Sequence, residues 1–583
     1  MAAALSNKMS LSSWRIEKIA VIGAGIVGVP MAALLARAKI RVGTDSPARV
    51  VIIQRNSPTS GWKVAALNSG RSPIAGIEPD LDAIVSETVA ERVLSADHSY
   101  EELRDADVIL ICVQTDKLDL GPDYGPLMES LKDLALQLQK KPAGKKPLII
   151  FESTLAPTTM NTLIRQFFSS HGLEDGRDLL LGNSPNRVMP GRLVERVISS
   201  DKVIGGLNSI TPHFIQRLYS LIVTKGRLHP TNCLTAEIVK TVENAYRDVR
   251  IAYSAEIARF CDDHDIDYYQ VREDVNRQLV WSDNATASPN AVPAGGLLIP
   301  TVGVGGHCLP KDGILLLWKK IESGANMSGS LILEARRIND ESPAAALRCV
   351  ERLFGDLSGK SIALLGVAYR FNSEDTRNSP TFVLARYLID KACRVHLHDP
   401  YVNPADQNLT RFKLEACFTR AMEEAVESAE YMLFCTAHHS YIEIWDRMIQ
   451  SCPNLKGVFD GCNLFGRPIV LEKGIAFGGI AKGIKSPSRS FLDFVRDGFR
   501  AVETGFANEL DGLIGFINQQ FARERFDGVD FRKVQEIAGT CVTGCQIVNP
   551  GPVEKISPYK GFLPRLVDRA INYPSSNSSV RLT

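Results

Sequence analysis

The sequence has no long apolar run and almost no excess of charge of one sign, and each absence excludes a class of protein. No stretch approaches the roughly 20 consecutive apolar residues that a membrane-spanning helix requires, so we expect no membrane partner. The formal net charge is +1 at pH 7, so no overall electric field favours binding to nucleic acid. The N-terminal residues also lack the apolar run of a signal peptide.

Cysteine occurs twelve times, but at scattered positions that form no repeating framework. Cys541 and Cys545 form a close pair, and no second pair follows at the spacing of a zinc site, so we expect no bound metal. Scattered cysteines are typical of proteins whose thiols stay reduced, which predicts a cytoplasmic location. No repeat of solenoid period is present, and 583 residues are too many for one hydrophobic core, which predicts several domains.

One glycine-rich stretch, Val302–Asp312, gathers residues that carry chemistry around a single cysteine, Cys308. His307 and Lys311 place positive charge near the thiol, which favours the reactive thiolate, and Asp312 adds a carboxylate. A thiolate can attack an aldehyde carbon and hold a covalent intermediate. The alternative is that Cys308 is a buried and inert cysteine, as most cysteines are. Glycine at three of the four positions before His307 lets backbone approach a ligand closely: Gly303, Gly305 and Gly306.

The N-terminal part of the chain carries the pattern of a dinucleotide site. An apolar run, Lys18–Ile22, leads into Gly-x-Gly-x-x-Gly, and an amphipathic helical pattern continues to Ala38. Strand, glycine turn and helix in this order predict that the turn holds the pyrophosphate of NAD at the helix N-terminus. The residues assigned to cofactor binding there are Gly23, Gly25, Ile26, Val27 and Gly28.

The next predicted strand, Val50–Ile53, ends in Gln54 and Arg55, where a NAD site usually has an acid for the ribose 2′-hydroxyl. Gln54 can hydrogen-bond a ribose and Arg55 can accept a 2′-phosphate, so the sequence allows NADP as well as NAD. Two further predicted strands, Asp107–Val113 and Leu148–Phe151, also end in polar residues. Ligands bind outside the carboxyl ends of parallel strands, so these residues are site candidates, although many such residues simply begin a loop: Thr115, Glu152 and Thr154.

A helical pattern from Asn232 to Phe260 places four polar residues on one face, because they follow one another at spacings of three, four and three. Such a stripe is usually solvated, but asparagine is a poor choice in the middle of a surface helix. A lysine and an asparagine one turn apart can stabilise developing charge on an oxygen. The four residues are Glu237, Lys240, Asn244 and Arg247.

A second series of strands and helices begins at Ser361–Leu365 and continues to Val458–Asp460. These strands predict another small parallel sheet with its own ligand edge. After the first of them, Arg370 and Arg377 are suited to phosphate or to a base that carries a carbonyl group. One or two helices are expected from 486 to 521, and the chain from Pro574 onward is typical of a flexible tail.

The sequence therefore predicts an α/β protein of four parts. A Rossmann-like, doubly wound domain that binds NAD is expected at 15–230, and a central helical domain with the cysteine loop at 231–345. A second Rossmann-like α/β domain is expected at 346–485, and a mostly helical extension at 486–583.

From about Ile16 to Gly483, these motifs resemble, in this order, the UDP-glucose/GDP-mannose dehydrogenase family of nucleotide-sugar 6-dehydrogenases. The family pattern Gly-x-Gly-Gly-His-Cys-x-Pro-x-Asp matches 303–312, and the family helix stripe matches 237–247. The Glu-Ser-Thr segment matches 152–154, and Asp-x-Arg-x-Ser-Pro matches 375–380. His307 resembles the branch that acts on UDP-N-acetylhexosamines more than the UDP-glucose branch, which usually has serine at this position.

The resemblance implies that the C6 hydroxyl of a nucleotide sugar is oxidised by two molecules of NAD, through a thiohemiacetal and a thioester on Cys308. It implies that Lys240 and Asn244 stabilise the oxyanion, and that Asp312 orients or activates water and lysine. A nucleotide sugar is the expected partner, with its nucleotide on the second α/β domain, and a homodimer through the central helices is expected. The residues assigned to substrate binding are Asn186, Arg187, Arg247, Gly303, Gly305, Gly306, Arg370 and Arg377.

Two positions depart from the family pattern. Asn186 stands where the family usually has a glutamate that acts near the thioester step, and an amide does not titrate as a base in water. Gln54 stands where the ribose acid is expected. A second hypothesis is therefore a degenerate relative that binds nucleotide sugar without completing the oxidation, and a third is a two-electron hydroxyacid dehydrogenase. Glu152 is the best candidate to replace the missing base.

Overall fold

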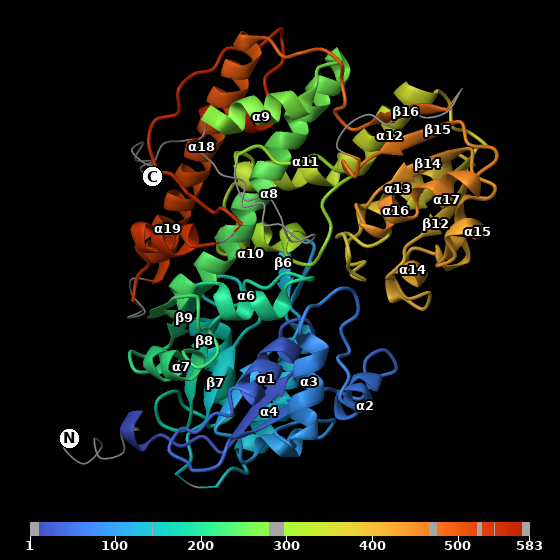
Figure 1. Ribbon diagram of the computed structural model, residues 1–583. Coiled ribbons are helices and arrows are strands. Elements are labelled where there is room, and N and C mark those ends of the chain that lie inside the picture. The colour runs from blue at the N-terminus through green and yellow to red at the C-terminus, as the bar shows by residue number, and fades with distance from the viewer. Residues whose placement is uncertain are drawn as a thin grey trace. The chain divides into compact units, whose positions relative to one another are not determined.

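The computed structural model describes residues 11–142, 144–278, 296–465, 475–521, 527–541 and 543–573. The chain divides into two compact units. The first unit consists of Met1–Val242 and Ile517–Cys541, and the second of Glu243–Phe516 and Val542–Thr583. Figure 1 labels their helices and strands. In sequence, the boundaries fall within helix α8, Cys233–His264, within helix α18, Arg489–Phe521, and after Cys541.

The first unit is built on an eight-stranded sheet with the strand order β10-β9-β8-β7-β4-β1-β2-β3. Neighbouring strands are parallel, except that β8 pairs with β9 in the antiparallel direction. The elements are η1 Leu11–Ser13, β1 Lys18–Ile22, α1 Gly28–Arg37, β2 Arg49–Ile53, α2 Trp62–Asn68, α3 Leu81–Ala90, β3 Leu94–Asp97, η2 Tyr100–Leu103, β4 Val108–Ile111, the hairpin β5 Asp116–Leu118 and β6 Gly121–Asp123, α4 Gly125–Leu138, β7 Leu148–Phe151, η3 Met160–Ile164, α5 Arg165–Ser170, β8 Leu180–Asn183, α6 Leu193–Ser199, β9 Lys202–Gly206, α7 Thr211–Tyr219, β10 Leu228–Asn232 and α19 Phe531–Gly539.

The central strands of this sheet are buried on both faces, as a parallel sheet covered by helices requires. Successive residues of β1 point to opposite faces, so Ile19 and Val21 pack in one core and Ala20 and Ile22 pack in the other. Helices α1, α3, α6 and α7 cover the first face, and α4 and α5 cover the second. We therefore expect ligand contacts at the carboxyl ends of the strands and in the loops that follow them.

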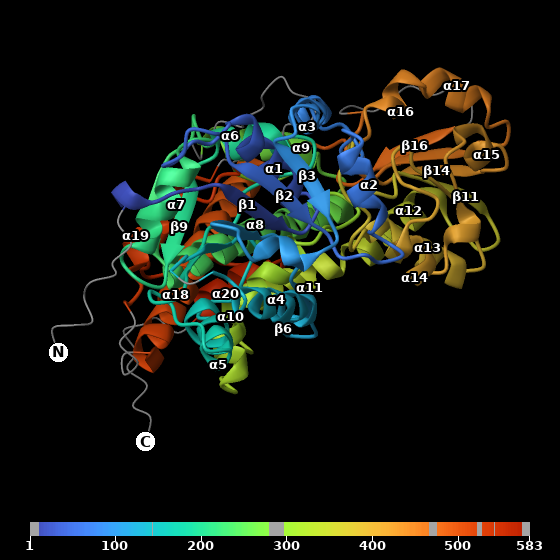
Figure 2. The same ribbon diagram turned by 90° about the horizontal axis from the view of Figure 1, so that it is seen from below.

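The second unit contains a six-stranded parallel sheet with the order β13-β12-β11-β14-β15-β16. Figure 2 shows α16 and α17 on one face of this sheet and α12 and α13 on the other. Its elements are β11 Ser361–Leu365, α13 Pro380–Asp390, β12 Arg394–His398, α14 Gln407–Arg411, η4 Glu415–Cys417, β13 Phe418–Thr419, α15 Met422–Val426, β14 Tyr431–Phe434, α16 Ser440–Glu443, α17 Trp445–Gln450, β15 Gly457–Asp460 and β16 Ala476–Gly479.

The remaining helices of the second unit surround the C-terminal part of α8. Capping residues fix where some of them begin: the Ser330 hydroxyl accepts a hydrogen bond from the Leu333 N–H at the start of α11, and the Ser379 hydroxyl does the same for Thr381 at the start of α13. The helices are α9 Tyr268–Gln278, α10 Leu309–Glu322, α11 Leu331–Asp340, α12 Ser342–Phe354, α18 Arg489–Phe521 and α20 Arg565–Asn572.

The predicted α/β class is confirmed, with a Rossmann-like sheet, a helical region, a second parallel sheet and a helical extension. The predicted strand at 18–22 coincides with β1, and the predicted strand at 361–365 coincides with β11. The helix predicted at 232–260 lies in α8 from Cys233 onward, whereas Asn232 is the last residue of β10. The predicted tail from Pro574 lies outside the described residues. Within the described ranges, no helix combines the length and the apolar composition that crossing a membrane requires.

Candidate active site

The glycine turn assigned to the cofactor connects β1 to α1 at the carboxyl edge of the first sheet. Gly23 has φ +109°, a conformation that favours glycine, and a Cβ there would lie 2.6 Å from the Cys112 carbonyl oxygen. A Cβ at Gly28 would collide with the Gly23 carbonyl oxygen. At Gly25, by contrast, a Cβ would have open space to 4 Å among the described residues. The turn is therefore tight where the fold needs it and open where a pyrophosphate would approach, so these residues fit a bound dinucleotide.

Gln54 follows β2 and braces the glycine turn. Its Oε1 atom accepts a hydrogen bond from the Ala24 N–H at 2.9 Å, and its Nε2 atom donates to the Ser60 hydroxyl at 2.9 Å. Arg55 points its guanidinium at two carboxylates of α4: it forms a short ion pair with Glu129 and a longer one, 3.5 Å, with Asp133. The two residues assigned to the adenosine ribose thus already have partners within the protein.

The carboxylates around Arg55 lead to a prediction about the cofactor. A 2′-phosphate placed at Arg55 would meet the negative charges of Glu129 and Asp133, so we expect kcat/KM for NAD to exceed that for NADP by tenfold or more, or about 1.4 kcal/mol. The double variant Glu129→Gln with Asp133→Asn should narrow this ratio, whereas Lys132→Ala on the same helix should leave it unchanged. Equal use of NAD and NADP by the unaltered protein would contradict the prediction.

Thr115 and Thr154 lie together at the same edge of the sheet. Thr115 follows β4, Thr154 follows β7, and the Thr115 hydroxyl donates a hydrogen bond of 2.7 Å to the Thr154 carbonyl oxygen. Because β4 pairs with both β1 and β7, these loops stand beside the glycine turn in strand order. The predicted cofactor residues of the first unit therefore share one sheet edge.

Glu152 lies at the end of β7 in a fully buried polar cluster. Its Oε2 atom forms an ion pair of 2.8 Å with Lys202 and accepts a short hydrogen bond from the Asn186 amide, and its Oε1 atom accepts another from the Tyr219 hydroxyl. Burial raises the pKa of Glu152 and the nearby Lys202 opposes this shift, while burial lowers the pKa of Lys202. The Lys202 amine also donates to the Ser184 carbonyl oxygen at 2.7 Å. The structure thus brings together Glu152 and Asn186, which the sequence named for separate reasons.

Arg187, assigned to substrate, holds the C-terminal end of α19 within the first unit. Its guanidinium donates to the Ile537 carbonyl oxygen at 2.9 Å, to the Thr540 hydroxyl at 2.8 Å and to the Asp201 carbonyl oxygen at 2.9 Å. These contacts give Arg187 a clear role in fastening a segment that follows residue 485.

The polar residues predicted to share one face of α8 differ in their exposure to solvent. The buried carboxylate of Glu237 accepts hydrogen bonds of 2.8 Å from the Thr158 and Met160 N–H groups, which fixes the start of η3. Lys240 follows one turn later and is partly exposed. Glu237 is therefore part of the framework of the first unit, whereas Lys240 retains access to solvent.

Cys308 lies at the N-terminus of α10 in the second unit. It is the N-cap residue of that helix, and its side chain makes no capping hydrogen bond. The positive end of a helix dipole favours an anion at this position, which suits a thiolate. Cys308 is partly exposed, whereas nine of the twelve cysteines are buried. Among the buried ones, burial raises the pKa of Cys435 to about 12 and that of Cys452 to about 11.

One turn into α10, Asp312 forms the centre of a polar network. Its Oδ2 atom accepts a hydrogen bond of 2.6 Å from the Asn244 amide, and its Oδ1 atom forms an ion pair of 2.5 Å with Lys311. Asp312 and Lys311 are almost completely buried, at 0% and 1% exposure, while Asn244 is partly exposed. Both carboxylate oxygens are therefore engaged, and Asn244 is held by its amide nitrogen so that its carbonyl oxygen faces elsewhere.

The glycines before His307 pack against the segment that carries Arg377. A Cβ at Gly303 would lie 2.6 Å from Pro380, and a Cβ at Gly306 would lie 2.8 Å from the Tyr369 ring. The Gly306 N–H donates to the Arg377 carbonyl oxygen at 2.7 Å. The close approach that these glycines permit is thus filled, in this structure, by the protein's own chain, and it joins two of the predicted substrate motifs.

The remaining arginines assigned to substrate lie in the second unit with partners of their own. Arg377 forms an ion pair of 2.5 Å with Asp375, and although burial by itself would lower the pKa of Arg377, Asp375 raises it above the ordinary value. Arg370 stacks over the Phe371 ring at 4.9 Å from the ring centre, and Arg247 donates to the Thr543 carbonyl oxygen at 3.3 Å.

Sequence reasoning missed several residues that complete these clusters: Lys202, Tyr219, Tyr369 and Asn378. A lysine at the start of the otherwise apolar run Lys202–Gly206 is a signal that a buried charge needs a partner. No pattern in the sequence indicates that Asn378 donates to the Gly306 carbonyl oxygen, because that contact joins segments 72 positions apart.

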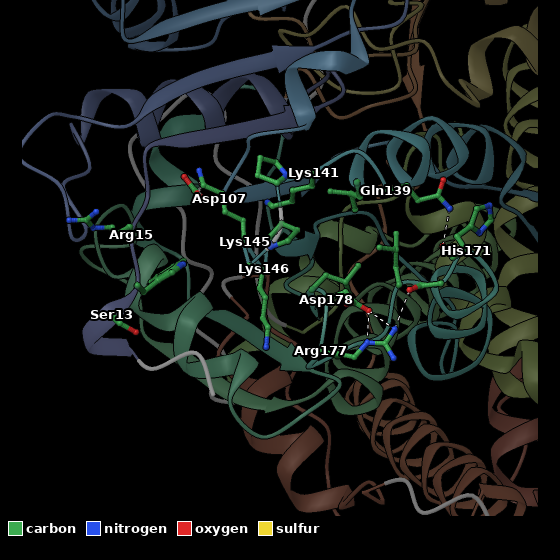
Figure 3. A pocket seen from close by; sticks show the side chains of 18 residues that line it. Ser13, Arg15, Asp107, Gln139, Lys141, Lys145, Lys146, His171, Arg177 and Asp178 are labelled. Atoms are coloured by element: carbon green, nitrogen blue, oxygen red, sulfur yellow. Dashed lines mark hydrogen bonds and ion pairs between the residues drawn. The ribbon is translucent and has the colours of Figure 1, made fainter. Parts of the chain in front are cut away.

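A hollow of about 880 Å³ lies at the opposite edge of the first sheet (Figure 3). Asp107, Pro147 and Leu179 immediately precede β4, β7 and β8, and they line it together with Lys141 and Lys145. No residue assigned to cofactor, substrate or catalysis lines this hollow. It is therefore separate from the candidate active site.

Three family models match this chain in succession. The NAD binding domain of the UDP-glucose/GDP-mannose dehydrogenase family matches residues 17–223, its central domain matches 234–341, and its UDP binding domain matches 363–467. The matched order is the order in which the glycine turn, the cysteine loop and the second sheet occur.

Individual relatives agree with these models. A UDP-N-acetyl-D-mannosamine dehydrogenase of Pyrococcus horikoshii is 31% identical over 80% of this chain and 99% of its own length, and one of Campylobacter jejuni is 27% identical over 75% and 99%. The solved structure of the Pyrococcus horikoshii UDP-D-ManNAc dehydrogenase superposes with a TM-score of 0.65 over 80% of this chain and 99% of that one, at 31% identity. The UDP-N-acetyl-mannosamine dehydrogenase of Staphylococcus aureus gives 0.63 at 26% identity over 80% and 99%. With its glycine turn open to a dinucleotide and its cysteine at a helix N-terminus, this chain belongs to the UDP-glucose/GDP-mannose dehydrogenase family of NAD-dependent oxidoreductases.

Proposed function

We propose that this protein oxidises the C6 hydroxyl of a UDP sugar to the carboxylate, with NAD as the acceptor. The names of its relatives favour a UDP-N-acetylhexosamine, and UDP-N-acetyl-D-mannosamine in particular. His307 in the cysteine loop supports the same choice, because the family's UDP-glucose branch usually has serine there. The observation that carries the proposal is Cys308 at the N-terminus of α10, with the Asp312 network one turn away.

The chemistry of the proposal balances as two oxidations and one hydrolysis. The first oxidation removes a hydride from C6 and a proton from its hydroxyl, which leaves an aldehyde. The Cys308 thiolate forms a carbon–sulfur bond with the aldehyde carbon, the oxygen takes up a proton, and loss of a second hydride and a proton gives a thioester. Water then breaks the carbon–sulfur bond, releasing the carboxylate and restoring the thiol. NAD held at the glycine turn between β1 and α1 would supply the hydride acceptor for each oxidation.

The polar residues of α8 and α10 have distinct parts in this scheme. Lys240 and Asn244 lie one turn apart on α8 and are assigned to stabilise the substrate oxygen as negative charge develops on it, Asn244 through the amide hydrogen that Asp312 does not accept. Asp312 acts as a positioning residue, because its Oδ2 atom accepts from the Asn244 amide and so fixes the orientation of that side chain. The Lys311 ammonium forms an ion pair with Asp312 and so compensates the charge of this buried carboxylate.

A relative that binds the nucleotide sugar without completing the oxidation is the second candidate, and Asn186 is the observation that favours it. The two candidates are separated by incubating the protein and NAD with UDP-N-acetylmannosamine, UDP-N-acetylglucosamine, UDP-glucose and GDP-mannose in turn. We expect absorbance of reduced nicotinamide with at least one UDP sugar. Calorimetric binding of a sugar without any reduction of NAD would favour the binding-only candidate.

Asn186 also predicts which step limits turnover. Because an amide cannot act as a general base, we expect slow hydrolysis of the thioester, so that reduced cofactor appears in a rapid burst followed by a slower steady phase. Asn186→Glu should raise the steady rate by about tenfold or more and shrink the burst, since a positioned base typically contributes at least that much. Stopped-flow absorbance of the reduced nicotinamide measures both phases.

A matched variant separates basicity from size at this position. Asn186→Gln has the length of glutamate without its acidity, so it should keep the burst and the slow steady phase. Glu152 is the protein's own candidate base, and it already accepts a hydrogen bond from Asn186. A reaction with no burst in the unaltered protein, and no change on Asn186→Glu, would show that hydrolysis is not limiting.

A further inference from the structure

The C-terminal extension places a second long helix along α8 within the second unit. Helix α8 has 32 residues and α18 has 33, and Figure 1 shows them side by side. The Tyr246 hydroxyl donates to Glu503 at 2.6 Å, and the Tyr253 hydroxyl donates to the Val495 carbonyl oxygen at 2.7 Å. As residue numbers rise along α8, their partners on α18 fall, so the two helices are antiparallel.

An aromatic seam joins the two helices. Three rings of α8, on Tyr246, Tyr253 and Phe260, follow one another at intervals of seven residues, so they lie on one face. Each meets a ring of α18, with centres 5.3 Å apart for Tyr246 and Phe506, 6.0 Å for Tyr253 and Phe499, and 5.2 Å for Phe260 and Phe491. The exposed fraction of all six residues is 4% or less. The extension therefore buries an apolar stripe that runs the length of α8 in this unit.

Buried glutamates fasten the extension to the helices of the core. Glu509 of α18 accepts hydrogen bonds from the Leu331 and Ile332 N–H groups, at 2.9 and 3.1 Å, and so caps the start of α11. In the other direction, Glu256 of α8 accepts from the Arg565 and Leu566 N–H groups, at 2.8 and 3.2 Å, and caps the start of α20. Such reciprocal caps satisfy N–H groups that a helix start otherwise leaves without a partner.

Without α18, the three aromatic side chains of α8 in this seam would be exposed to solvent. A stripe of three large aromatic residues on an exposed helix is the kind of apolar surface that a protein covers, commonly by association. Two copies of α8 related by a two-fold axis across this stripe would lie antiparallel, which is the relation that α8 has to α18. None of the three family models extends beyond residue 467, so the extension is an addition to the parts that define the family.

We propose that α18 takes the position that the α8 helix of a second copy would occupy, and that the extension thereby keeps this protein a monomer. The family resemblance implies a homodimer through the central helices, so the two statements differ in the mass that the protein should have in solution. The proposal concerns the packing of the second unit and holds whichever sugar the protein oxidises.

The first test is the mass of the full chain in solution. Sedimentation equilibrium over a wide range of concentration should give the mass of one chain, 64.0 kDa. A mass of twice that value would overturn the proposal, because α8 would then be covered by another copy or the extension would be exchanged between copies.

The second test opens the seam. A Cβ at Gly498 would collide with the Tyr253 hydroxyl, so Gly498→Leu should displace α18 from α8, expose the aromatic stripe and shift the mass toward a dimer. Gly515 lies on the same helix, and a Cβ there would have no atom of the described residues within 4 Å, so Gly515→Leu should remain a monomer. If Gly498→Leu retains the helical circular dichroism of the unaltered protein and still sediments as one chain, α18 is not what prevents self-association. If the variant loses that signal, the mass of the unaltered protein alone decides.

Discussion

Replacing Cys308 by serine should reduce uronate formation by at least about 10³-fold, the scale seen when a covalent nucleophile is removed. A hydroxyl is far less acidic than a thiol, so it traps an aldehyde poorly and gives no thioester. The fold should tolerate the change, because serine is close to cysteine in size and the Cys308 side chain makes no capping hydrogen bond that would be lost. Product formation and a binding isotherm for the same UDP sugar should therefore separate, with catalysis lost and binding retained.

Cys417 provides a matched control for this substitution. It is also partly exposed and lies in the second unit, at the end of the short helix η4, away from the cysteine loop in sequence. Cys417→Ser should leave both uronate formation and binding unchanged. Unchanged turnover in Cys308→Ser would remove the covalent mechanism from the account.

Glu152→Gln should destabilise the protein by about 3–5 kcal/mol, the cost of removing one partner from a buried ion pair. Glutamine keeps the shape of the side chain but leaves the Lys202 ammonium with the Ser184 carbonyl oxygen and without a counter-charge. Urea unfolding should show a lower midpoint. If Glu152 also acts as the base for thioester hydrolysis, the steady rate of reduced-cofactor formation should fall below its level in the unaltered protein under conditions where the variant is fully folded.

Two further variants show whether the loss of stability in Glu152→Gln comes from breaking the buried ion pair between Glu152 and Lys202. Glu129→Gln removes an exposed carboxylate from its ion pair with Arg55, and the unfolding midpoint should barely move. Adding Lys202→Met to Glu152→Gln should recover much of the lost stability, because the uncompensated charge is then absent. A normal midpoint in Glu152→Gln alone would mean that the pair contributes little, and a selective loss of the steady rate in that variant would favour catalysis over structure.

The sequence predicts the positions of strands that consist of a short run of buried apolar residues. The strands β1, β7 and β11 are short apolar segments followed by glycine or polar residues, and their positions follow from that pattern. The strands β9 and β10 do not show this pattern. Strand β9, Lys202–Gly206, begins with a buried lysine and ends in two glycines, and β10, Leu228–Asn232, contains histidine and proline. Their pairing depends on partners elsewhere in the sheet, which no local pattern reports.

The candidate site shows the same division between local and long-range information. Motifs predict that Cys308, Asn244 and Asp312 belong to polar or reactive segments, because a motif depends only on neighbours in sequence. The hydrogen bond from Asn244 to Asp312 spans 68 positions, and the one from Asn186 to Glu152 spans 34, so only the fold places them together. The seam between α8 and α18 joins residues even farther apart in sequence, since Tyr246 and Glu503 are 257 positions apart. No property of either helix alone predicts which face of α8 the extension covers.

The stoichiometry of cofactor reduction tests the central claim most directly. The protein is mixed with excess NAD and a limiting, known amount of UDP-N-acetylmannosamine, or of whichever UDP sugar in the panel reduces the cofactor, and the reaction is followed to completion by absorbance. The product is identified by mass spectrometry. A four-electron oxidation through Cys308 predicts two molecules of reduced cofactor for each sugar consumed, with a uronate as the product. One molecule of reduced cofactor per sugar, with an aldehyde or ketone as the product, would contradict it.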